Sequence, residues 1–340
     1  MHSSPFYSCY SDSIVLPKLI HIENNLYVAS FYVMKLLPAK YMLDQAYQKG
    51  ELTERSVVAE TSSGSFALGI GIVCREMNLP FHIVSDCFLD LYLKKQLESL
   101  GGVVHIAEKP AIKGGFQKAR LDVLNNILDN TPNSYWPCQY DNPDNAKAYE
   151  RFGKMICDTF PQKKLVLVGP VGSGGSTCGT MQFIREINQD AKLIGVDTVN
   201  SILFGLKDGP RHLIGLGNSI MPKNLNHSLF DEVHWVSAEE AFCAARELHY
   251  KKGLFLGPTT GASLIAARWA AEKNKDHTVI FISPDEGHRY IHSVYDLEWL
   301  RSNELYQSTI PNHPIKTNAP SNELTKWSYM HWDRRSISQI

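Results

Sequence analysis

A glycine-rich segment, "GPVGSGGS" at residues 169–176, has the composition of an anion-binding loop. It follows the apolar run "KKLVLV" and precedes a helical pattern, "TCGTMQFIREI". When a strand turns through glycines into a helix, free backbone N–H groups and the positive end of the helix dipole point at the same place. The segment therefore predicts a phosphate site, and the alternative is an ordinary strand-to-helix turn.

Two common phosphate motifs do not describe this loop. A P-loop has a lysine directly after its last glycine, and no lysine follows here. The dinucleotide motif G-x-G-x-x-G has a glycine spacing that Gly172, Gly174 and Gly175 do not match. It also needs an acidic residue about 20 positions further on. Asp197, after "KLIGV", lies near that distance and keeps the dinucleotide interpretation open.

Composition restricts the class of protein. The chain has 340 residues, of which 44% are hydrophobic, so it can build two domains or one large α/β unit. The net charge of −1 leaves no electrostatic footprint for nucleic acid or for an anionic membrane surface. No apolar run is long enough to span a membrane, and the polar start is not a secretory signal. Seven scattered cysteines without C-x-x-C spacing indicate reduced thiols in a cytoplasmic protein, with no zinc site.

Apolar strand-like runs alternate with helical patterns along most of the chain. This alternation predicts parallel sheets with helices on both faces. The strand-like runs are "SVVAE" (56–60), "PFHIVS" (80–85), "VVHIAE" (103–108), "KKLVLVGP", "AKLIGVD" (191–197), "EVHWVS" and "TVIFIS". The tail after about residue 305 contains three prolines and no clear period, so an irregular extension is expected there, with Trp and Tyr side chains that pack on the protein.

Polar loops follow several of these strands, at the sheet edge where open α/β folds bind ligands. They are "ETSSGSFALG" (60–69), "GLGNSIMPKN" (215–224), "GPTTGAS" (257–263) and "SPDEGHRY" (283–290). Upstream, a lysine opens an amphipathic helical pattern in "YVMKLLPAKYML" (32–43).

In this order, the segments resemble the fold-type II pyridoxal-phosphate (PLP) enzymes of the cysteine synthase and cystathionine β-synthase group. The family patterns K-[DL]-x-x-A-x-x-M, E-x-T-S-G-N-T-G, Q-[YF]-x-N-P-x-N and G-x-G-T-G-G-T correspond to "KLLPAKYM", "ETSSGSFA", "QYDNPDN" and "GPVGSGGS". "GLGNSIMP", "GPTTGA" and "PDEGHRY" also correspond, and the order and spacing of the seven motifs agree with the family over about residues 14–300.

The resemblance implies a two-domain α/β fold like that of the tryptophan synthase β chain, each domain being a mostly parallel sheet flanked by helices. Residues 1–45 and 146–304 would form the larger, PLP-binding domain, and residues 46–145 the smaller, mobile, substrate-side domain. Residues 305–340 would be the irregular extension. The resemblance also implies a homodimer that acts on small amino acids, with no nucleic-acid or membrane partner.

The same resemblance assigns the site. Lys35 corresponds to the Schiff-base lysine, and Lys40, the nearest alternative, is out of register with the motif. The residues that would bind the cofactor are Ser65, Gly172, Ser173, Gly174, Gly175, Ser176 and Glu286. The residues that would bind the substrate carboxylate are Ser62, Ser63, Gly64 and Gln139. A helix N-cap is the alternative role for the serine segment, and a turn is the alternative for Gln139. No metal is expected, because no histidine has ligand spacing.

Three positions depart from the family pattern. The loop before the lysine is shorter, and Val33 and Met34 replace small residues there. Ser65 stands where the family has an asparagine that contacts the phenolic oxygen of PLP. Glu286 stands where a serine contacts the ring nitrogen, and a carboxylate there would keep that nitrogen protonated.

The resemblance implies PLP-dependent β-elimination and β-replacement on an activated L-serine, either O-phospho- or O-acetylserine. The "KLLPA" and "ETSSG" variants resemble the diaminopropionate-forming branch, in which an amino group is the nucleophile and the product enters siderophore or other secondary-metabolite synthesis. Three enzymatic alternatives stay open: cysteine synthase-like addition of sulfide or a thiol, a serine/threonine dehydratase, and a racemase. The altered positions leave a fourth, a cofactor-binding protein with little catalysis.

Overall fold

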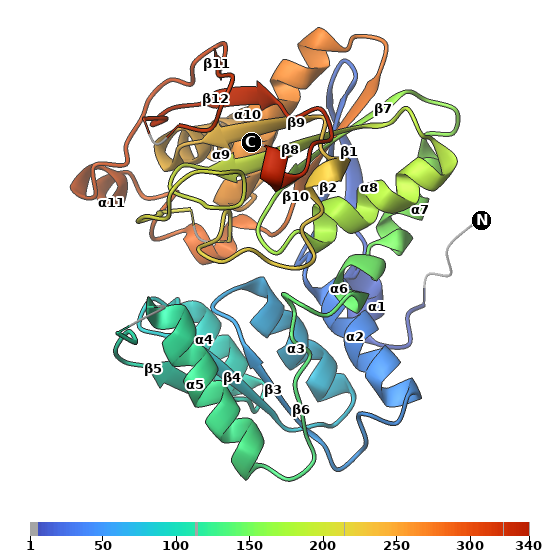
Figure 1. The fold of residues 1–340 in the computed structure, drawn as a ribbon, viewed down its shortest axis with the longest axis vertical. Helices are drawn as coiled ribbons and strands as arrows, with labels where there is room; N and C mark the ends of the chain where they lie inside the picture. Colours follow the sequence, from blue (N-terminus) through green and yellow to red (C-terminus); the bar gives the residue numbers. More distant parts are fainter. Residues whose placement is uncertain (1–5, 113–114, 214, 322, 340) are drawn as a thin grey trace. The chain divides into compact units, whose positions relative to one another are not determined.

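The computed structural model describes residues 6–112, 115–213, 215–321 and 323–339. These residues form two compact units. The first contains the described residues of Met1–Leu16 and Val33–Ala148, and the second contains those of Pro17–Tyr32 and Tyr149–Ile340. Each unit has its own sheet and its own covering helices (Figure 1).

The first unit is built on a parallel sheet with the strand order β5-β4-β3-β6. The strands are β3(Val57–Thr61), β4(Phe81–Asp86), β5(Val103–Ala107) and β6(Ser134–Tyr135). Helices α3(Ser65–Glu76), α4(Leu91–Ser99) and α5(Gly115–Asn130) contact these strands. Strand β3 is buried from Val58 onward, which explains why its apolar residues Val57, Val58 and Ala59 are consecutive rather than alternating with polar ones.

Helix α2(Leu36–Gln48) belongs to this first unit, together with α1(Tyr10–Ile14) and α6(Asp144–Lys147). It packs on α3 at Gly69, where a Cβ atom would lie 2.9 Å from the Lys35 carbonyl oxygen and 3.1 Å from Ala39 Cβ. The expected boundary at residue 45 is therefore not where the structure divides the chain. The units separate at Val33, because α2 packs on helices of the smaller sheet.

The second unit has an eight-stranded sheet with the order β1-β2-β10-β7-β8-β9-β12-β11. The central strands β2, β10, β7, β8 and β9 are parallel. The strands are β1(Lys18–Glu23), β2(Leu26–Ser30), β7(Leu165–Pro170), β8(Lys192–Thr198), β9(Glu232–Val236), β10(Thr278–Ser283), β11(Ile315–Lys316) and β12(Ser328–His331). The helices are α7(Glu150–Thr159), α8(Gly175–Ile187), α9(Ala238–Lys252), α10(Pro258–Lys273) and α11(Leu297–Ser302), with short 3-10 turns η1(His227–Leu229), η2(Gly287–Tyr290) and η3(Ile337–Gln339). Helix α10 packs across β7, β8 and β10.

The C-terminal extension is part of this sheet. Strand β12 pairs antiparallel with β9, and β11 pairs with β12 (Figure 1). Trp327 is buried, and its Nε1 donates to His234 Nδ1 at 2.9 Å. These two short segments are therefore strands rather than irregular chain, held by the aromatic packing that the sequence predicts.

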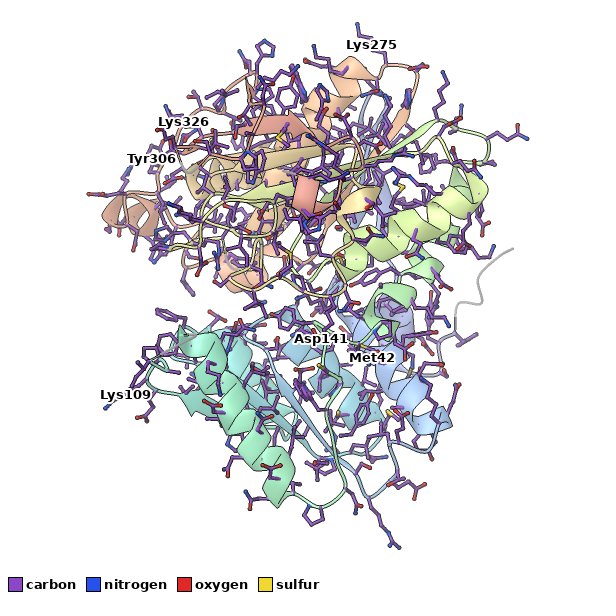
Figure 2. All side chains as sticks on the ribbon, in the orientation of Figure 1. Met42, Lys109, Asp141, Lys275, Tyr306 and Lys326 are labelled. Carbon is purple, nitrogen blue, oxygen red and sulfur yellow. The ribbon has the colours of Figure 1, made fainter. Side chains whose placement is uncertain are left out.

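Each unit has a core of buried apolar side chains. Met42 lies in the core of the first unit, whereas Lys109 projects from its surface (Figure 2). Within the described ranges, none of the helices combines the length and the apolar character that a membrane span requires.

Candidate active site

Lys35 is the residue directly before α2, with φ −76° and ψ 0°. Its Nζ donates a hydrogen bond to Gln139 Oε1 at 3.4 Å. Lys40 has different surroundings, since its Nζ lies 3.7 Å from Asp12 Oδ1 and 3.8 Å from Asp44 Oδ2. The two lysines on this stretch are thus distinct: Lys40 is in a surface ion pair, and Lys35 contacts a buried amide.

The serine segment forms the turn between β3 and α3. Gly64 is the N-cap of α3 in an extended conformation, and no side chain caps the helix. The Ser62 hydroxyl accepts from the Gly64 N–H at 3.3 Å. In the part of the chain that the structure describes, no hydrogen bond occupies the backbone N–H groups of Ser63, Ser65 and Phe66. These donors and the helix dipole suit a carboxylate, and the helix N-cap alternative does not hold for these serines.

Arg120, on α5, contacts the serine segment, which the sequence does not reveal. Its Nη1 donates to Ser63 Oγ at 3.3 Å and lies 3.2 Å from Asp86 Oδ2. The Arg120 side chain is only 13% exposed, and its Nε has no partner among the described residues. No local motif marks this arginine, because Ser63 lies 57 positions away in sequence. It places a buried cation beside the serine segment.

Gln139 is held by an extensive hydrogen-bond network. Its Nε2 donates to the Thr61 carbonyl at 3.2 Å, and its backbone N–H donates to Glu60 Oε2 at 3.2 Å. Glu60 Oε1 also accepts from Trp136 Nε1 at 3.0 Å. Burial raises the pKa of Glu60 to about 7, against the opposing effect of the N–H donors. Gln139 therefore belongs to a buried network that reaches Lys35 and is not simply a turn residue.

The glycine-rich loop connects β7 to α8 in the second unit. Gly174, the N-cap of α8, has φ +82°, and a Cβ atom there would lie 2.6 Å from Leu225 Cα. A Cβ atom on Gly172 would lie 3.1 Å from the Gly215 carbonyl oxygen. Among the described residues, no hydrogen bond uses the backbone N–H groups of residues 172–176. Position 174 therefore requires glycine, and the backbone N–H groups of the loop are donors that could bind a phosphate.

The segment after β10 carries two carboxylates with different surroundings. Asp285 is buried, and its Oδ2 accepts from Tyr290 OH at 2.8 Å. The Glu286 side chain is 37% exposed, and its Oε2 lies 3.3 Å from His288 Nδ1. The sequence singles out Glu286, whereas the structure adds Asp285 as the buried carboxylate of this turn.

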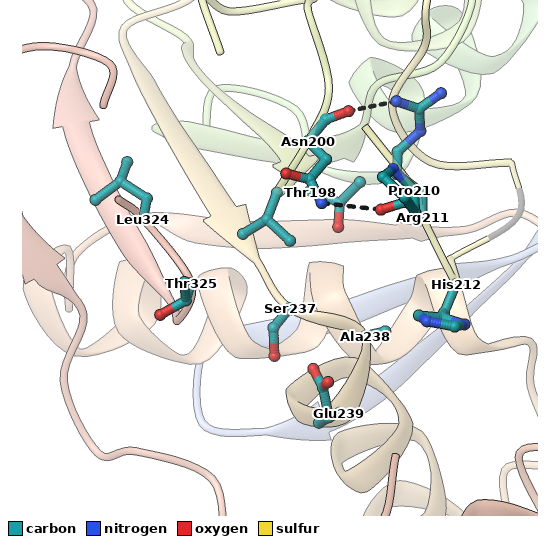
Figure 3. A pocket seen from close by; sticks show the side chains of 11 residues that line it. Thr198, Asn200, Pro210, Arg211, His212, Ser237, Ala238, Glu239, Leu324 and Thr325 are labelled. Atoms are coloured by element: carbon teal, nitrogen blue, oxygen red, sulfur yellow. Dashed lines mark hydrogen bonds between the residues drawn. The ribbon is translucent and has the colours of Figure 1, made fainter. Parts of the chain in front are cut away.

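A separate cavity of about 360 Å³ lies in the second unit, where β8 and β9 end (Figure 3). Its lining residues are Thr198, Val199, Asn200, Pro210, Arg211, His212, Ser237, Ala238, Glu239, Leu324 and Thr325. None of the predicted site residues is among them, so the cavity is not part of the predicted site.

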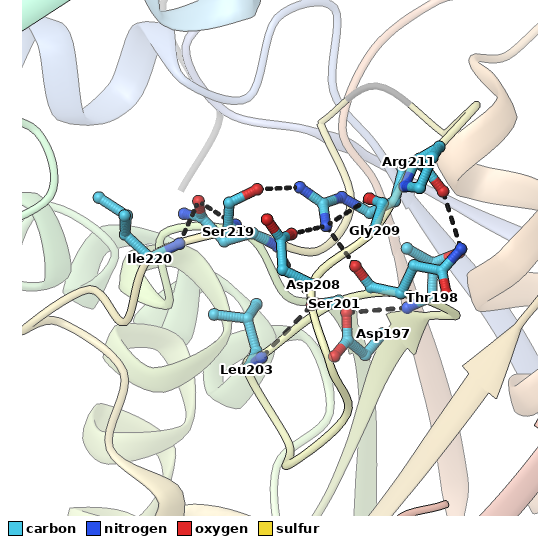
Figure 4. Close-up of polar contacts among 12 residues, drawn as sticks. Asp197, Thr198, Ser201, Leu203, Asp208, Gly209, Arg211, Ser219 and Ile220 are labelled. Carbon is cyan, nitrogen blue, oxygen red and sulfur yellow. Dashed lines mark hydrogen bonds and ion pairs between the residues drawn. The ribbon is translucent and has the colours of Figure 1, made fainter. Parts of the chain in front are cut away.

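Arg211 forms several hydrogen bonds within the loop that follows β8 (Figure 4). Its Nη1 donates to Asp208 Oδ1 at 2.8 Å, and its Nη2 donates to Ser219 Oγ at 2.6 Å. Asp197 is fully buried, and its Oδ1 accepts from the Thr198 N–H at 2.8 Å (Figure 4). Burial raises the pKa of Asp197 to about 7. An enclosed carboxylate of this kind is not available to a ribose hydroxyl, as the dinucleotide interpretation would need.

Residues 23–285 match the family described as "Pyridoxal-phosphate dependent enzyme". The chain belongs to this PLP-dependent family. Among curated relatives, the N-(2-amino-2-carboxyethyl)-L-glutamate synthase of Ralstonia nicotianae is 31% identical over 265 residues, which are 77% of this chain and 78% of that protein.

Two solved structures have a fold similar to that of this chain. An O-acetylserine dependent cystathionine β-synthase from Helicobacter pylori aligns with a TM-score of 0.78 and 24% identity, over 85% of this chain and 99% of that one. A hydrogen sulfide-producing enzyme from Fusobacterium nucleatum aligns with a TM-score of 0.77 and 25% identity, over 84% and 100%. The predictions of fold class, of PLP as cofactor and of a cysteine synthase-type enzyme are confirmed.

The residues present fit PLP. Its phosphate needs backbone donors, which residues 172–176 offer without an intramolecular partner among the described residues. Its aldehyde needs an amine, and Lys35 offers one, whose Nζ donates to the Gln139 amide oxygen. When bound, PLP supplies an electron sink for negative charge at the α-carbon of an amino acid.

Proposed function

We propose that this chain catalyses PLP-dependent β-replacement on an activated L-serine, O-phospho- or O-acetyl-L-serine, with an amino group as the nucleophile. The observation that carries the proposal is the 31% identity, over more than three quarters of both chains, to an enzyme named for joining a 2-amino-2-carboxyethyl group to L-glutamate. The proposed nucleophile is accordingly the amine of an acidic amino acid.

We propose a role for each predicted group. Lys35 Nζ is proposed to bind the cofactor and to move the proton of the substrate α-carbon. The N–H groups that begin α3 are proposed to hold the α-carboxylate at Ser62, Ser63 and Gly64, with Gln139 beside them. Arg120 is proposed to bind a further anionic group of the reactants next to this segment, because its guanidinium lies beside Ser63 and donates to the Ser63 hydroxyl.

Cofactor contacts are proposed at the remaining predicted positions. Residues 172–176 would hold the phosphate, Ser65 would lie near the phenolic oxygen, and Glu286 would lie near the ring nitrogen. The first unit is proposed as the substrate-side domain and the second as the larger, cofactor-binding domain.

Three broader properties are proposed as well. The chain would form a homodimer, act in the cytoplasm, and supply an amino acid for a siderophore or another secondary metabolite. Light scattering at micromolar concentration is expected to give twice the 38.3 kDa mass of the chain, and a mass near 38.3 kDa would contradict the dimer.

The test of function is identification of the product. PLP-loaded protein is incubated with O-phospho-L-serine or O-acetyl-L-serine, together with L-glutamate, and products are identified by mass spectrometry. The expected product carries the new C–N bond at the serine β-carbon. Accumulation of pyruvate and ammonia alone would instead indicate a dehydratase, and absence of turnover with either donor would contradict the proposal.

A second candidate is sulfide addition, favoured by the fold shared with the O-acetylserine dependent and hydrogen sulfide-producing enzymes. Replacing glutamate by sulfide in the same assay separates the two candidates. A kcat/KM for sulfide that exceeds that for every amine tested would support cysteine synthase-like chemistry.

A further inference from the structure

Glu60 is a buried carboxylate surrounded by donors. It is 1% exposed, and its Oε1 accepts from the Thr61 N–H at 2.7 Å and from Trp136 Nε1 at 3.0 Å. The Gln139 N–H donates to Oε2 at 3.2 Å, and the Cys138 N–H also donates to the carboxylate. Four N–H groups therefore face two oxygens, and these donors offset only part of the effect by which burial raises the pKa of Glu60.

The backbone that supplies two of these donors has an unusual conformation. Cys138 has φ +56°, a left-handed geometry that non-glycine residues adopt only when the surroundings compensate. The Cys138 carbonyl accepts from the N–H groups of Asp141 and Asn142, at 3.1 and 2.9 Å. Backbone hydrogen bonds within the turn and hydrogen bonds from the turn to Glu60 thus both hold its conformation. Asp141 of this turn is labelled in Figure 2.

The turn fixes the orientation of the Gln139 amide. Its Nε2 faces the Thr61 carbonyl at 3.2 Å, so its Oε1 is the atom that faces Lys35 Nζ, at 3.4 Å. A reversed amide would direct its NH₂ group at the ammonium and its oxygen at another oxygen. The carboxyl end of β3 therefore holds Gln139 in two ways. Glu60 accepts from the Gln139 backbone, and the Thr61 carbonyl accepts from the Gln139 side chain.

We propose that Glu60 is a positioning residue: its carboxylate fixes the turn at residues 136–139 so that the Gln139 amide oxygen stays on Lys35 Nζ and orients that amine. The catalytic meaning of this contact rests on the proposed role of Lys35. The contact itself belongs to the first unit and does not depend on substrate or cofactor. A carbonyl oxygen on an ammonium stabilises the charged form, so a displaced turn would leave Lys35 easier to deprotonate.

The test measures the protonation of Lys35 in the full chain freed of PLP. Lysines are labelled with an amine-reactive reagent across a pH series, and the rate at each lysine is read by peptide mass spectrometry. In Glu60→Gln the midpoint for Lys35 is expected to fall by about one pH unit, a tenfold gain in free amine at a given pH. Lys40, on the helix that begins directly after Lys35, is the internal control and should keep its midpoint.

Glu240→Gln is the matched variant, because Glu240 is also 1% exposed and accepts backbone N–H groups, from Ser237 and Trp327, but in the second unit. This variant should leave the Lys35 midpoint unchanged. An unchanged Lys35 midpoint in folded Glu60→Gln, or an equal shift in Glu240→Gln, overturns the proposal.

If Glu60→Gln does not fold, Glu60→Asp replaces it, because a carboxylate set back by one methylene group cannot reach both the Thr61 and the Gln139 sides. The same downward shift is expected, and its absence overturns the proposal. Because labelling needs neither PLP nor substrate, an unchanged midpoint together with normal product formation refutes only the role of Glu60. A shifted midpoint without product formation refutes only the proposed function.

Discussion

Replacing Gly174 by alanine tests whether the loop at residues 172–176 holds the phosphate of PLP. Gly174 has φ +82°, and a left-handed conformation disfavours a non-glycine residue by about 1–2 kcal/mol. Its Cβ would also lie 2.6 Å from Leu225 Cα and 2.7 Å from Leu225 N. Ordinary contacts between carbon atoms are about 3.5–4.0 Å, so the loop or the Leu225 backbone must move by about 1 Å.

A displacement of this size weakens phosphate binding directly. Hydrogen bonds from N–H groups are about 2.9 Å long and are largely lost about 1 Å beyond that length. Losing one charge-assisted bond of about 1.5–3 kcal/mol lowers PLP affinity by about tenfold or more. Titration of cofactor-free Gly174→Ala with PLP, followed by absorbance, gives this ratio.

Gly253→Ala is the matched control. Gly253 ends α9 with φ +70°, and no atom lies within 4 Å of the position that a Cβ would take there. This variant should lose about 1–2 kcal/mol of stability through its backbone conformation alone and keep wild-type PLP affinity. If Gly174→Ala bound PLP as tightly as Gly253→Ala, the phosphate would not lie at this loop.

Three further perturbations have expected outcomes. The pKa of Glu60 is about 7 in the folded chain and 4.5 when unperturbed, so the folded chain binds the proton of Glu60 more tightly than the unfolded chain does. The contribution of this proton to the free energy of unfolding is therefore lost as pH rises from 4.5 through 7. Urea titrations should show a decrease of about 3 kcal/mol over this range that Glu60→Gln abolishes, and equal slopes in both proteins contradict the burial argument. Arg120→Met should raise KM for an acidic nucleophile by about tenfold, since a hydrogen bond to a charged group contributes about 1.5–3 kcal/mol, and an unchanged KM refutes the contact. Glu286→Ser should change the absorption spectrum of bound PLP, whereas identical spectra mean that Glu286 does not contact the ring.

The central strands of both sheets could be predicted because they are buried on both faces. β3, β4, β7, β8 and β10 each contain a short, mainly apolar run without regular alternation, and each lies within a residue or two of its predicted position. The β1–β2 hairpin was not predicted, since its residues are only partly apolar. Its signal was the Asn24–Asn25 pair, in which Asn24 adopts φ +46° at the turn.

The buried network around Gln139 could not be predicted for a different reason. Glu60 contacts Trp136 and Gln139, which lie 76 and 79 positions away, and no local pattern encodes such contacts. The left-handed conformation of Cys138 has no sequence signal either, because cysteine is not a residue that favours it. Family motifs predict the loops of the proposed site, and only the folded chain shows which contacts hold these loops in place.

Reduction of the PLP-loaded chain with borohydride, followed by peptide mapping, tests the central claim most directly, because it locks the cofactor on the lysine that binds it. We expect a single modified peptide that carries the cofactor on Lys35, and no modification in Lys35→Ala. Modification of Lys40 or of another lysine in the wild-type chain, or retention of the cofactor on Lys35→Ala, would contradict it.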